Sequence, residues 1–445
     1  MIERIVATCG LRPCPTPSTR LLVAVAGAAL FGSSTVALAA DVPKRNDARY
    51  VKQCPAAGSD FYGGFWYIPG SNTCMSFGGY LWAEGYYNSF TDMPEVNRKT
   101  YGIATYGLQI DTRTETEYGL LRSYMDIRLQ YRLVDEWGAP IEGASGTQIT
   151  PWTMYIQFGG FIFGYNQSVF DFYANANVEG TDPATIGDQT NLTMLAYTWD
   201  FNDGWSATLS IEESSERNAG VNPANADAKD NLTAKSDIPD IVGAFGQSGN
   251  WGKFQISGAL HRETVVLALP SGEAGGIDGG SFWGYAVQAG VMFNLPQIAN
   301  GDTLYLQAAY VDGAVSYLGL INASGDFSPP DAFQTSDGGF SKVSGWNATF
   351  QYLHNFSTRW NAAIFGGYAE FDLNNLEAQA TIGASGGINY NLGGNITWQP
   401  SPAFSLTLQY DYNMYKAKDY VDTGNGLPVS AQEASQVLLM AQRLF

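Results

Sequence analysis

The chain has 445 residues, of which 42 are acidic and 23 basic, and its net charge at pH 7 is −19. Such an acidic chain would repel phosphate groups, which argues against nucleic-acid binding. Aromatic residues make up 14% of the sequence, yet no stretch after Ala40 reaches the about 18 uninterrupted apolar residues of a membrane-spanning helix.

The first 39 residues have the pattern of a secretory signal peptide. Arg4, Arg12 and Arg20 precede an apolar run, residues 21–39, which ends in small residues as a signal peptidase requires. A membrane anchor is the alternative, but glycine and polar residues at 32–35 interrupt the run and no cluster of charges follows it. Cleavage would remove three of the basic residues and one acidic residue, which leaves a net charge of −21.

Two cysteines, Cys54 and Cys74, remain in the exported chain. They would lie in an oxidising compartment and close a short loop, so we predict a disulfide that stabilises the fold by about 3 kcal/mol. Two free thiols are the alternative. We expect residues 40–73 to form an N-terminal segment, pinned by this bridge, that leads into one domain at residues 74–445.

Strands with a period of two residues dominate the rest of the chain. In the clearest, residues 120–133, the odd positions are apolar except for Ser123, and the even positions include Arg122 and Arg128. Successive side chains of a strand point to opposite faces, so one face of this strand would suit hydrocarbon and the other water. The same division recurs at residues 205–212, 252–263 and 404–413.

Three features favour a membrane barrel over a soluble β-sandwich. The strands run for about ten residues or more, aromatic residues gather near strand ends, and short turns alternate with long polar loops. We expect short turns at residues 202–204 and 358–359, and long loops at 214–237 and 320–344. The sequence therefore predicts an all-β fold, a transmembrane antiparallel β-barrel.

From Cys74 to Phe445 the pattern predicts sixteen strands, enough to leave an aqueous lumen, whereas eight would be filled by side chains. We expect them at residues 75–87, 101–114, 118–134, 151–158, 161–169, 191–201, 205–213, 238–246, 251–263, 281–295, 303–318, 345–357, 360–372, 387–399, 404–415 and 434–445.

Five segments in order along the chain carry a family resemblance. They are CPAAGSDFYGGFWYIPGSNTC at 54–74, DTRTETEYGLLRSY at 111–124, YIQFGGFIFGYNQSVFDFY at 155–173, IPDIVGAF at 238–245 with WGKFQISGALH at 251–261, and GYAVQAGVMFNLPQIANGDTLYLQAAYVDGA at 284–314. With these segments the chain resembles the alphaproteobacterial porins, typified by those of rhizobia and Brucella. The resemblance implies a sixteen-stranded outer-membrane barrel, a homotrimer, and a third extracellular loop folded into the lumen.

Four arginines on two adjacent expected strands are candidates for a basic wall at the pore constriction: Arg113, Arg122, Arg128 and Arg132. Charges around a narrow, wet point select solutes by size and by how well they replace hydration. Ordinary lumen polarity, or salt bridges to Asp111 and Asp126, is the alternative role for these arginines.

The third extracellular loop, at about residues 170–189, would lie opposite this wall. Its acidic residues are candidates for the other side of the constriction: Asp171, Glu179, Asp182 and Asp188. Acidic residues in extracellular loops otherwise serve to solvate them. The overall acidic balance predicts weak cation selectivity, which the arginines would oppose where the pore is narrowest.

Phe445 ends the last expected strand, and such a C-terminal aromatic resembles the signal that the barrel assembly machinery reads. A simple interface aromatic is the alternative. Outer-membrane lipid and lipopolysaccharide would surround the barrel.

An enzyme is one alternative function. Catalytic barrels need a histidine arranged with a nucleophile, but neither His261 nor His354 has a motif-grade serine or acid beside it in the sequence. We therefore predict no enzymatic activity, no cofactor and no metal site.

Two further alternatives are a substrate-selective channel and an adhesin. A sugar channel would show an aromatic track, for which the candidates are Tyr80, Trp82, Tyr86, Tyr124 and Tyr305. An adhesin would use the long polar loops. The sequence favours a general diffusion porin that passes small hydrophilic solutes and ions across the outer membrane.

Overall fold

The computed structural model describes residues 54, 64–90, 98–134, 146–173, 175–181, 185–187, 189–223, 232–268, 276–320, 328–423 and 430–445. The expected signal peptide, residues 1–39, lies outside this described part, as does most of the expected segment 40–73. In the described part, no helix is both long and apolar enough to cross a membrane.

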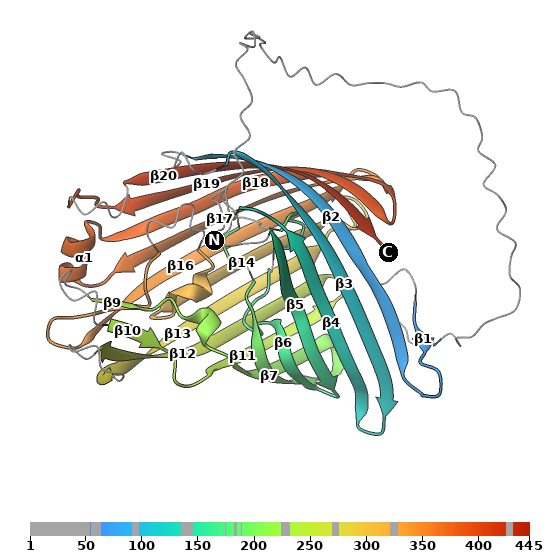
Figure 1. Cartoon of the computed structure of the whole chain (residues 1–445), viewed down its shortest axis with the longest axis horizontal. Coiled ribbons are helices and arrows are strands. Elements are labelled where there is room, and N and C mark those ends of the chain that lie inside the picture. The colour runs from blue at the N-terminus through green and yellow to red at the C-terminus, as the bar shows by residue number, and fades with distance from the viewer. Residues whose placement is uncertain are drawn as a thin grey trace, which may run out of the picture. The chain divides into compact units, whose positions relative to one another are not determined.

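Sixteen of the described strands form a closed antiparallel barrel (Figure 1). They are β2 Cys74–Phe90, β3 Thr100–Thr116, β4 Gly119–Tyr131, β5 Thr147–Phe158, β6 Phe161–Gln167, β7 Asn191–Asp200, β8 Trp205–Glu212, β11 Asp240–Gly249, β12 Gly252–Ala268, β13 Gly276–Asn294, β14 Thr303–Asp312, β16 Phe340–Asn355, β17 Trp360–Leu373, β18 Gly386–Ser401, β19 Phe404–Lys418 and β20 Ala431–Leu444. The ring closes where β20 pairs with β2. Closure satisfies the backbone groups that an open sheet edge would expose to lipid.

The two ends of the barrel differ in their connections. Short turns join β3 to β4, β5 to β6 and β11 to β12, and the C-terminus lies at this end. The opposite end carries the long loops, which contain α1 Leu376–Ile382 and the short strands β9 Val221–Pro223, β10 Leu232–Lys235 and β15 Ala332–Gln334. In barrels of this kind short turns face the periplasm and long loops face outward.

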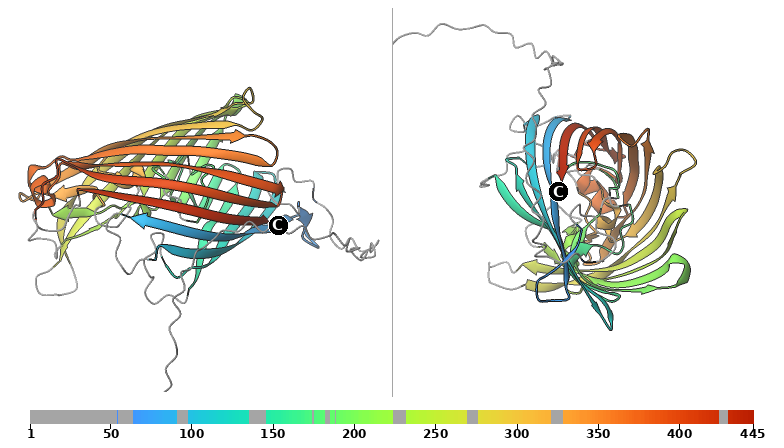
Figure 2. Two further views of the ribbon diagram at one scale, coloured as in Figure 1. Left: turned by 90° about the horizontal axis from the view of Figure 1, so that it is seen from above. Right: turned by 90° about the vertical axis from the view of Figure 1, so that its right-hand side faces the viewer.

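The short strands tie the long loops together. β9 pairs in parallel with β15, which pairs in turn with β16, and β10 pairs with β12. The right view of Figure 2 looks into the ring of strands from the end that carries the C-terminus.

Each of the sixteen expected strands is present, and most errors lie at their ends. The strand expected at 303–318 was drawn too long: β14 ends at Asp312, and a 3-10 helix, η4 Val315–Leu318, follows. Gly313, with φ of +67°, turns the chain out of the strand. Conversely, β13 begins at Gly276 because its glycine-rich start does pair with β12.

The predicted disulfide is confirmed. Cys54 and Cys74 are bonded with their Cα atoms 5.9 Å apart, a normal separation for such a bridge. Both cysteines are buried together with Phe65, and β1 Trp66–Tyr67 pairs with the start of β2. The bridge therefore fastens the segment before the barrel to the first barrel strand.

Candidate pore constriction

The strand faces lie as the alternation predicted. On β4, Leu129 is 44% exposed on the outer surface, whereas its neighbour Arg128 is 9% exposed and faces inward. On β19 the exposed Leu408 and Tyr410 alternate with the buried Gln409 and Asp411. The barrel thus presents apolar side chains to lipid and polar side chains to its interior.

Loop three lies between β6 and β7, and its described residues, 168–173, 175–181, 185–187 and 189–190, make hydrogen bonds to inward-facing side chains of the barrel wall. Near its start, the Phe170 carbonyl accepts hydrogen bonds from Ser257 and Gln288 of β12 and β13. Near its middle, the Glu179 amide donates to Gln409 of β19. The loop therefore runs from the β12–β13 wall across the interior.

The returning half of loop three is held first by β2 and then by β16 and β14, next to the wall where the loop starts. Thr181 donates from its amide and its hydroxyl to Glu84 of β2. The Ile186 carbonyl accepts from Thr349 of β16, and the Gly187 carbonyl accepts from Gln307 of β14. Inward-facing polar side chains from much of the ring thus fix the backbone of this loop.

A glycine in the barrel wall, Gly290, leaves room for part of loop three. A Cβ atom at Gly290 of β13 would lie 2.2 Å from the Phe172 ring. Any larger residue there would displace Phe172, so this glycine serves the seating of the loop.

Two of the predicted wall arginines share one acid. Arg113 and Arg122 lie opposite each other on β3 and β4, and each forms a 2.8 Å salt bridge with Asp111. Arg122 also lies over the rings of Tyr124 and Tyr155. The salt-bridge role considered from the sequence therefore applies to both, and one carboxylate partly neutralises the pair.

Arg128 lies between aromatic rings on the inner face. Its guanidinium is 3.7 Å from the Trp152 ring centroid and 4.8 Å from that of Trp82, and it donates to the Tyr80 hydroxyl at 2.7 Å. Contacts of this kind hold a cation without neutralising it. The Tyr80 hydroxyl in turn donates to Asp126, so Arg128 is a fixed positive charge on the lumen wall that is linked to this acid through a tyrosine.

A bulge brings Trp152 to Arg128. The register between β4 and β5 shifts after Asp126, where Ile127 lies opposite Pro151. Proline has no N–H to donate to the ladder and is tolerated in sheets at such bulges. The fourth predicted arginine, Arg132, lies just beyond β4 and donates to the Val134 carbonyl.

Asp171 of loop three pairs with an arginine that the sequence analysis did not consider. Its carboxylate lies 2.7 Å from Arg217, and both side chains are buried. Burial raises the pKa of Asp171, while the Arg217 guanidinium and the Thr190 amide act in the opposite direction. Arg217 belongs to η2 Ser215–Arg217, so the pair joins loop three to the loop between β8 and β11.

Glu179 lies where loop three reaches β19. In the described part of the chain its carboxylate has no hydrogen-bond or ion-pair partner, and burial raises its pKa. The other two acidic candidates, Asp182 and Asp188, lie outside the described residues. Of the predicted loop acids that the structure describes, Asp171 is paired with an arginine, whereas Glu179 has no described neighbour that neutralises it.

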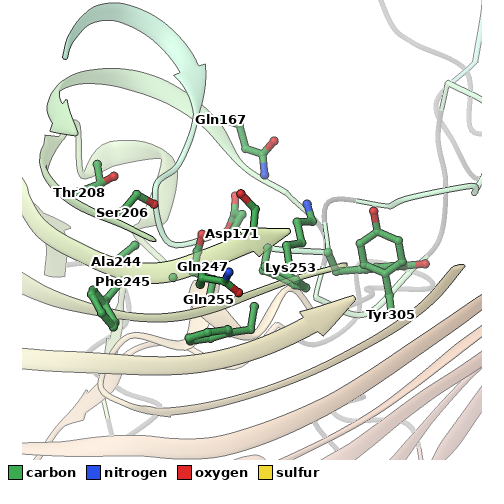
Figure 3. Close-up of a pocket in the computed structure, with 15 residues that line it drawn as sticks. Gln167, Asp171, Ser206, Thr208, Ala244, Phe245, Gln247, Lys253, Gln255 and Tyr305 are labelled. Carbon is green, nitrogen blue, oxygen red and sulfur yellow. The ribbon is translucent and has the colours of Figure 1, made fainter. Parts of the chain in front are cut away.

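A cavity of about 430 Å³ lies between loop three and the inner wall of β8, β11, β12 and β14 (Figure 3). Lys253 of β12 enters it, with its ammonium 4.9 Å from the Phe172 ring and 5.6 Å from the Tyr305 ring. Gln167, Asp171 and Lys253 point toward the same space in Figure 3. Among the described residues Lys253 has only these ring contacts.

The sequence analysis missed Glu84, Arg217 and Lys253 as site residues. Lys253 and Glu84 both lie on strands whose alternation is visible, so their inward direction could have been read. Arg217 lies in a loop without a period, and no sequence signal would have placed it. The aromatic-track candidates Tyr80, Trp82 and Tyr86 face inward, since Leu81 and Tyr87 between and beside them are exposed outside.

Phe445 completes the closure of the barrel. Its amide and carbonyl both pair with Gly79 of β2 at 3.0 Å, and its ring lies 5.4 Å from that of Tyr106. The last residue is thus part of the seam between the first and last strands.

Comparison with known proteins shows a family match and similar porins. The sequence profile of the porin subfamily matches residues 40–440. Porin Omp2b of Brucella canis is 27% identical over 256 residues, which cover 55% of this chain and 66% of that protein. Porin Omp2b of Brucella suis is 26% identical over 259 residues, with the same coverage. The chain thus matches just under two thirds of the length of these relatives.

The fold also matches that of a solved structure, the outer membrane channel DcaP of Acinetobacter baumannii. The TM-score is 0.63 at 13% identity, and the match covers 85% of this chain and 99% of that one. At this identity the likeness concerns the fold alone.

Proposed function

Because the chain belongs to the porin subfamily, whose members are channels and not enzymes, we propose that it forms a general diffusion pore for small hydrophilic solutes and ions. The protein is located in the bacterial outer membrane. The observation that carries the proposal is a closed ring of sixteen strands whose polar inner face makes hydrogen bonds to loop three.

The proposed constriction has basic and acidic sides. Arg128 supplies a fixed positive charge on the β4 wall, while Arg113 and Arg122 are partly neutralised by Asp111. Glu179 supplies a negative charge on loop three, with Asp182 and Asp188 as further candidates. Since the acidic residues of the chain outnumber the basic ones, we propose a weak cation preference.

Single-channel recording in a planar bilayer tests this function. Large ohmic current steps and a small reversal potential of cationic sign under a salt gradient are expected. A folded, inserted protein that carries no current would refute the proposal.

A solute-selective channel is the second candidate, and the cavity beside Lys253 favours it. The ammonium and the aromatic rings could together hold a solute that combines an anionic group with an apolar ring face. Saturable block of the current by sugars or by aromatic carboxylates would favour this candidate over the general pore.

Glu179 and Lys253, which have no ion-pair partner among the described residues, should have opposite effects on the ion preference. Glu179→Gln is expected to lower cation preference and Lys253→Gln to raise it, because each removes one charge from the lumen side. At about 7 Å in water a unit charge acts on an ion with about 0.6 kcal/mol, a factor of about three in local concentration. Reversal potentials of the two variants, measured at the same low salt, check the prediction. Equal shifts of the same sign would contradict it.

The ion preference should also depend on pH through Glu179. Since burial raises the pKa of this group, it becomes neutral at a higher pH than an ordinary glutamate when the solution is acidified. Cation preference is therefore expected to be full above the raised pKa and to fall as the pH is lowered through it. Reversal potentials between pH 8 and 4 would show this step in the wild type, and Glu179→Gln should show a smaller one.

We also propose that the protein is a homotrimer. β6 has only seven residues, whereas a tilted strand needs about 9–11 to span the hydrocarbon layer. A neighbouring copy of the chain would cover the part of the outer surface around the short strand β6 better than lipid would. Mobility on an unboiled gel should correspond to a trimer that heat dissociates, and a strictly monomeric species in mild detergent would count against it.

On the remaining outer surface we propose contact with lipid and lipopolysaccharide. We also propose that the barrel assembly machinery recognises Phe445.

A further inference from the structure

A buried cluster of one histidine and three acids lies at the end of the barrel that carries the long loops. His261 and Glu263 are on β12, Asp240 begins β11, and Asp331 precedes β15 in the loop between β14 and β16. All four side chains are 0% exposed. The sequence analysis predicted no metal site, and these residues come from three separate segments of the chain.

One nitrogen of His261 is held by Asp240. The distances from Nδ1 to the two carboxylate oxygens of Asp240 are 2.8 and 3.0 Å, and the Tyr317 hydroxyl donates to the same carboxylate at 2.6 Å. This arrangement directs the other nitrogen, Nε2, away from Asp240 with a fixed ring orientation, as carboxylates do for metal-binding histidines.

Nε2 faces two further carboxylates. It lies 3.1 Å from Glu263 Oε1 and 3.9 Å from Asp331 Oδ2, and ligand atoms of the three residues all lie within 4.8 Å of one another. A metal ion with bonds of about 2.0–2.2 Å separates its ligand atoms by about 3–4 Å. The widest spacing among the three groups, up to 4.8 Å, therefore has to contract by about 1–2 Å for them to surround one ion.

Among the described residues, no lysine or arginine forms a salt bridge with an acid of this cluster. Three carboxyl groups and one imidazole are thus gathered in a dry site, where a polar atom without a partner is unfavourable. Glu263 Oε2 is buried and has no hydrogen-bond partner in the described part of the chain. Arg217 reaches only the ring of Tyr317, at 4.5 Å, and pairs with Asp171.

We propose that His261, Glu263 and Asp331 bind a divalent transition-metal ion, with Zn²⁺ as the best match to one imidazole and two carboxylates. His261 binds through Nε2, and the free oxygen of Glu263 gains a partner. Three protein ligands leave a fourth position for a water molecule. Asp240 acts as a positioning residue for the histidine.

The site would fasten the long loops to the barrel wall. Asp331 accepts hydrogen bonds from the amides of Ala219 and Val315, which belong to the β8–β11 and β14–β16 loops. An ion bound between Asp331 and the two β12 residues would thus link both loops to a barrel strand. This is a structural metal site independent of the proposed pore function.

Zinc binding by the folded full chain tests the proposal. The protein is stripped with a chelator, dialysed and titrated with Zn²⁺ against a chromophoric competitor, and bound metal is counted by mass spectrometry. One Zn²⁺ per chain is expected for the wild type. His261→Ala should bind at least about tenfold more weakly, whereas His354→Ala should bind normally, because His354 pairs with Asp302 at a different place. The chain has no third histidine.

Wild-type protein that retains no Zn²⁺, or equal binding by His261→Ala and the wild type, would overturn the proposal. If His261→Ala does not fold, Asp240→Asn keeps all three ligands and is expected to weaken binding about 10–100-fold. Its Co²⁺ complex should still show the absorption bands of a nitrogen–oxygen site. Wild-type affinity in Asp240→Asn would remove Asp240 from the positioning role.

Discussion

Arg217→Ala is expected to lower the free energy of unfolding by about 3–5 kcal/mol, because it leaves the buried carboxylate of Asp171 without its partner. The salt bridge is 2.7 Å long with both side chains buried, and the guanidinium also lies 4.5 Å from the Tyr317 ring. The loss should act first on loop three, since Asp171 lies at its start, and should add current fluctuations in single channels.

Denaturant unfolding in detergent measures this change. Arg359→Ala is the control, because Arg359 is exposed in a short turn and should change stability by no more than about 0.5 kcal/mol. The double variant Asp171→Ala with Arg217→Ala should be less destabilised than Arg217→Ala alone, since no buried charge is then stranded. If Arg217→Ala resembles Arg359→Ala, the pair does not hold the loops.

Leu209→Arg is expected to destabilise the barrel by about 2–4 kcal/mol, because it places a charge in hydrocarbon near the middle of the bilayer. Leu209 is 50% exposed on the outer face of β8. It lies four residues from Trp205, which packs with Phe245 and Phe254 in the aromatic girdle near the short turns. Four residues of a tilted strand rise by about 10 Å, which reaches the centre of the apolar band.

The neighbouring Thr208 provides the matched control. Thr208 lines the lumen cavity beside loop three (Figure 3), so Thr208→Arg puts the same charge into water. It should change stability little and lower cation preference, whereas any barrel that Leu209→Arg still forms should keep its ion preference. Unfolding and reversal potential are measured for both variants. A selectivity shift in Leu209→Arg alone would mean that the lipid-facing and lumen-facing sides of β8 have been exchanged.

The inner and outer faces of the barrel could be predicted residue by residue, but the contacts on the inner face could not. Arg128 and Leu129 illustrate this difference. The two-residue period placed Arg128 inside and Leu129 outside, and the structure agrees. The period does not show that Arg128 stacks on Trp152, because that contact depends on a bulge at Pro151 and on the register between β4 and β5.

The acidic side of the constriction shows the same limit more strongly. Loop three carries acids in its sequence, but the partner of Asp171 is Arg217 from another loop, 46 residues further along the chain. Loops lack a periodic pattern, so nothing local distinguishes the paired Asp171 from Glu179, whose carboxylate has no described partner.

By itself the sequence determined the fold class, the sixteen strands, the disulfide and the direction of most strand side chains. These follow from local periodicity and from the chemistry of lipid and water on the two faces of each strand. Tertiary structure alone decided the path of loop three, the Asp171–Arg217 pair and the cluster around His261. Each of these joins segments far apart in the chain, and such contacts are set only when the barrel closes and its long loops pack together.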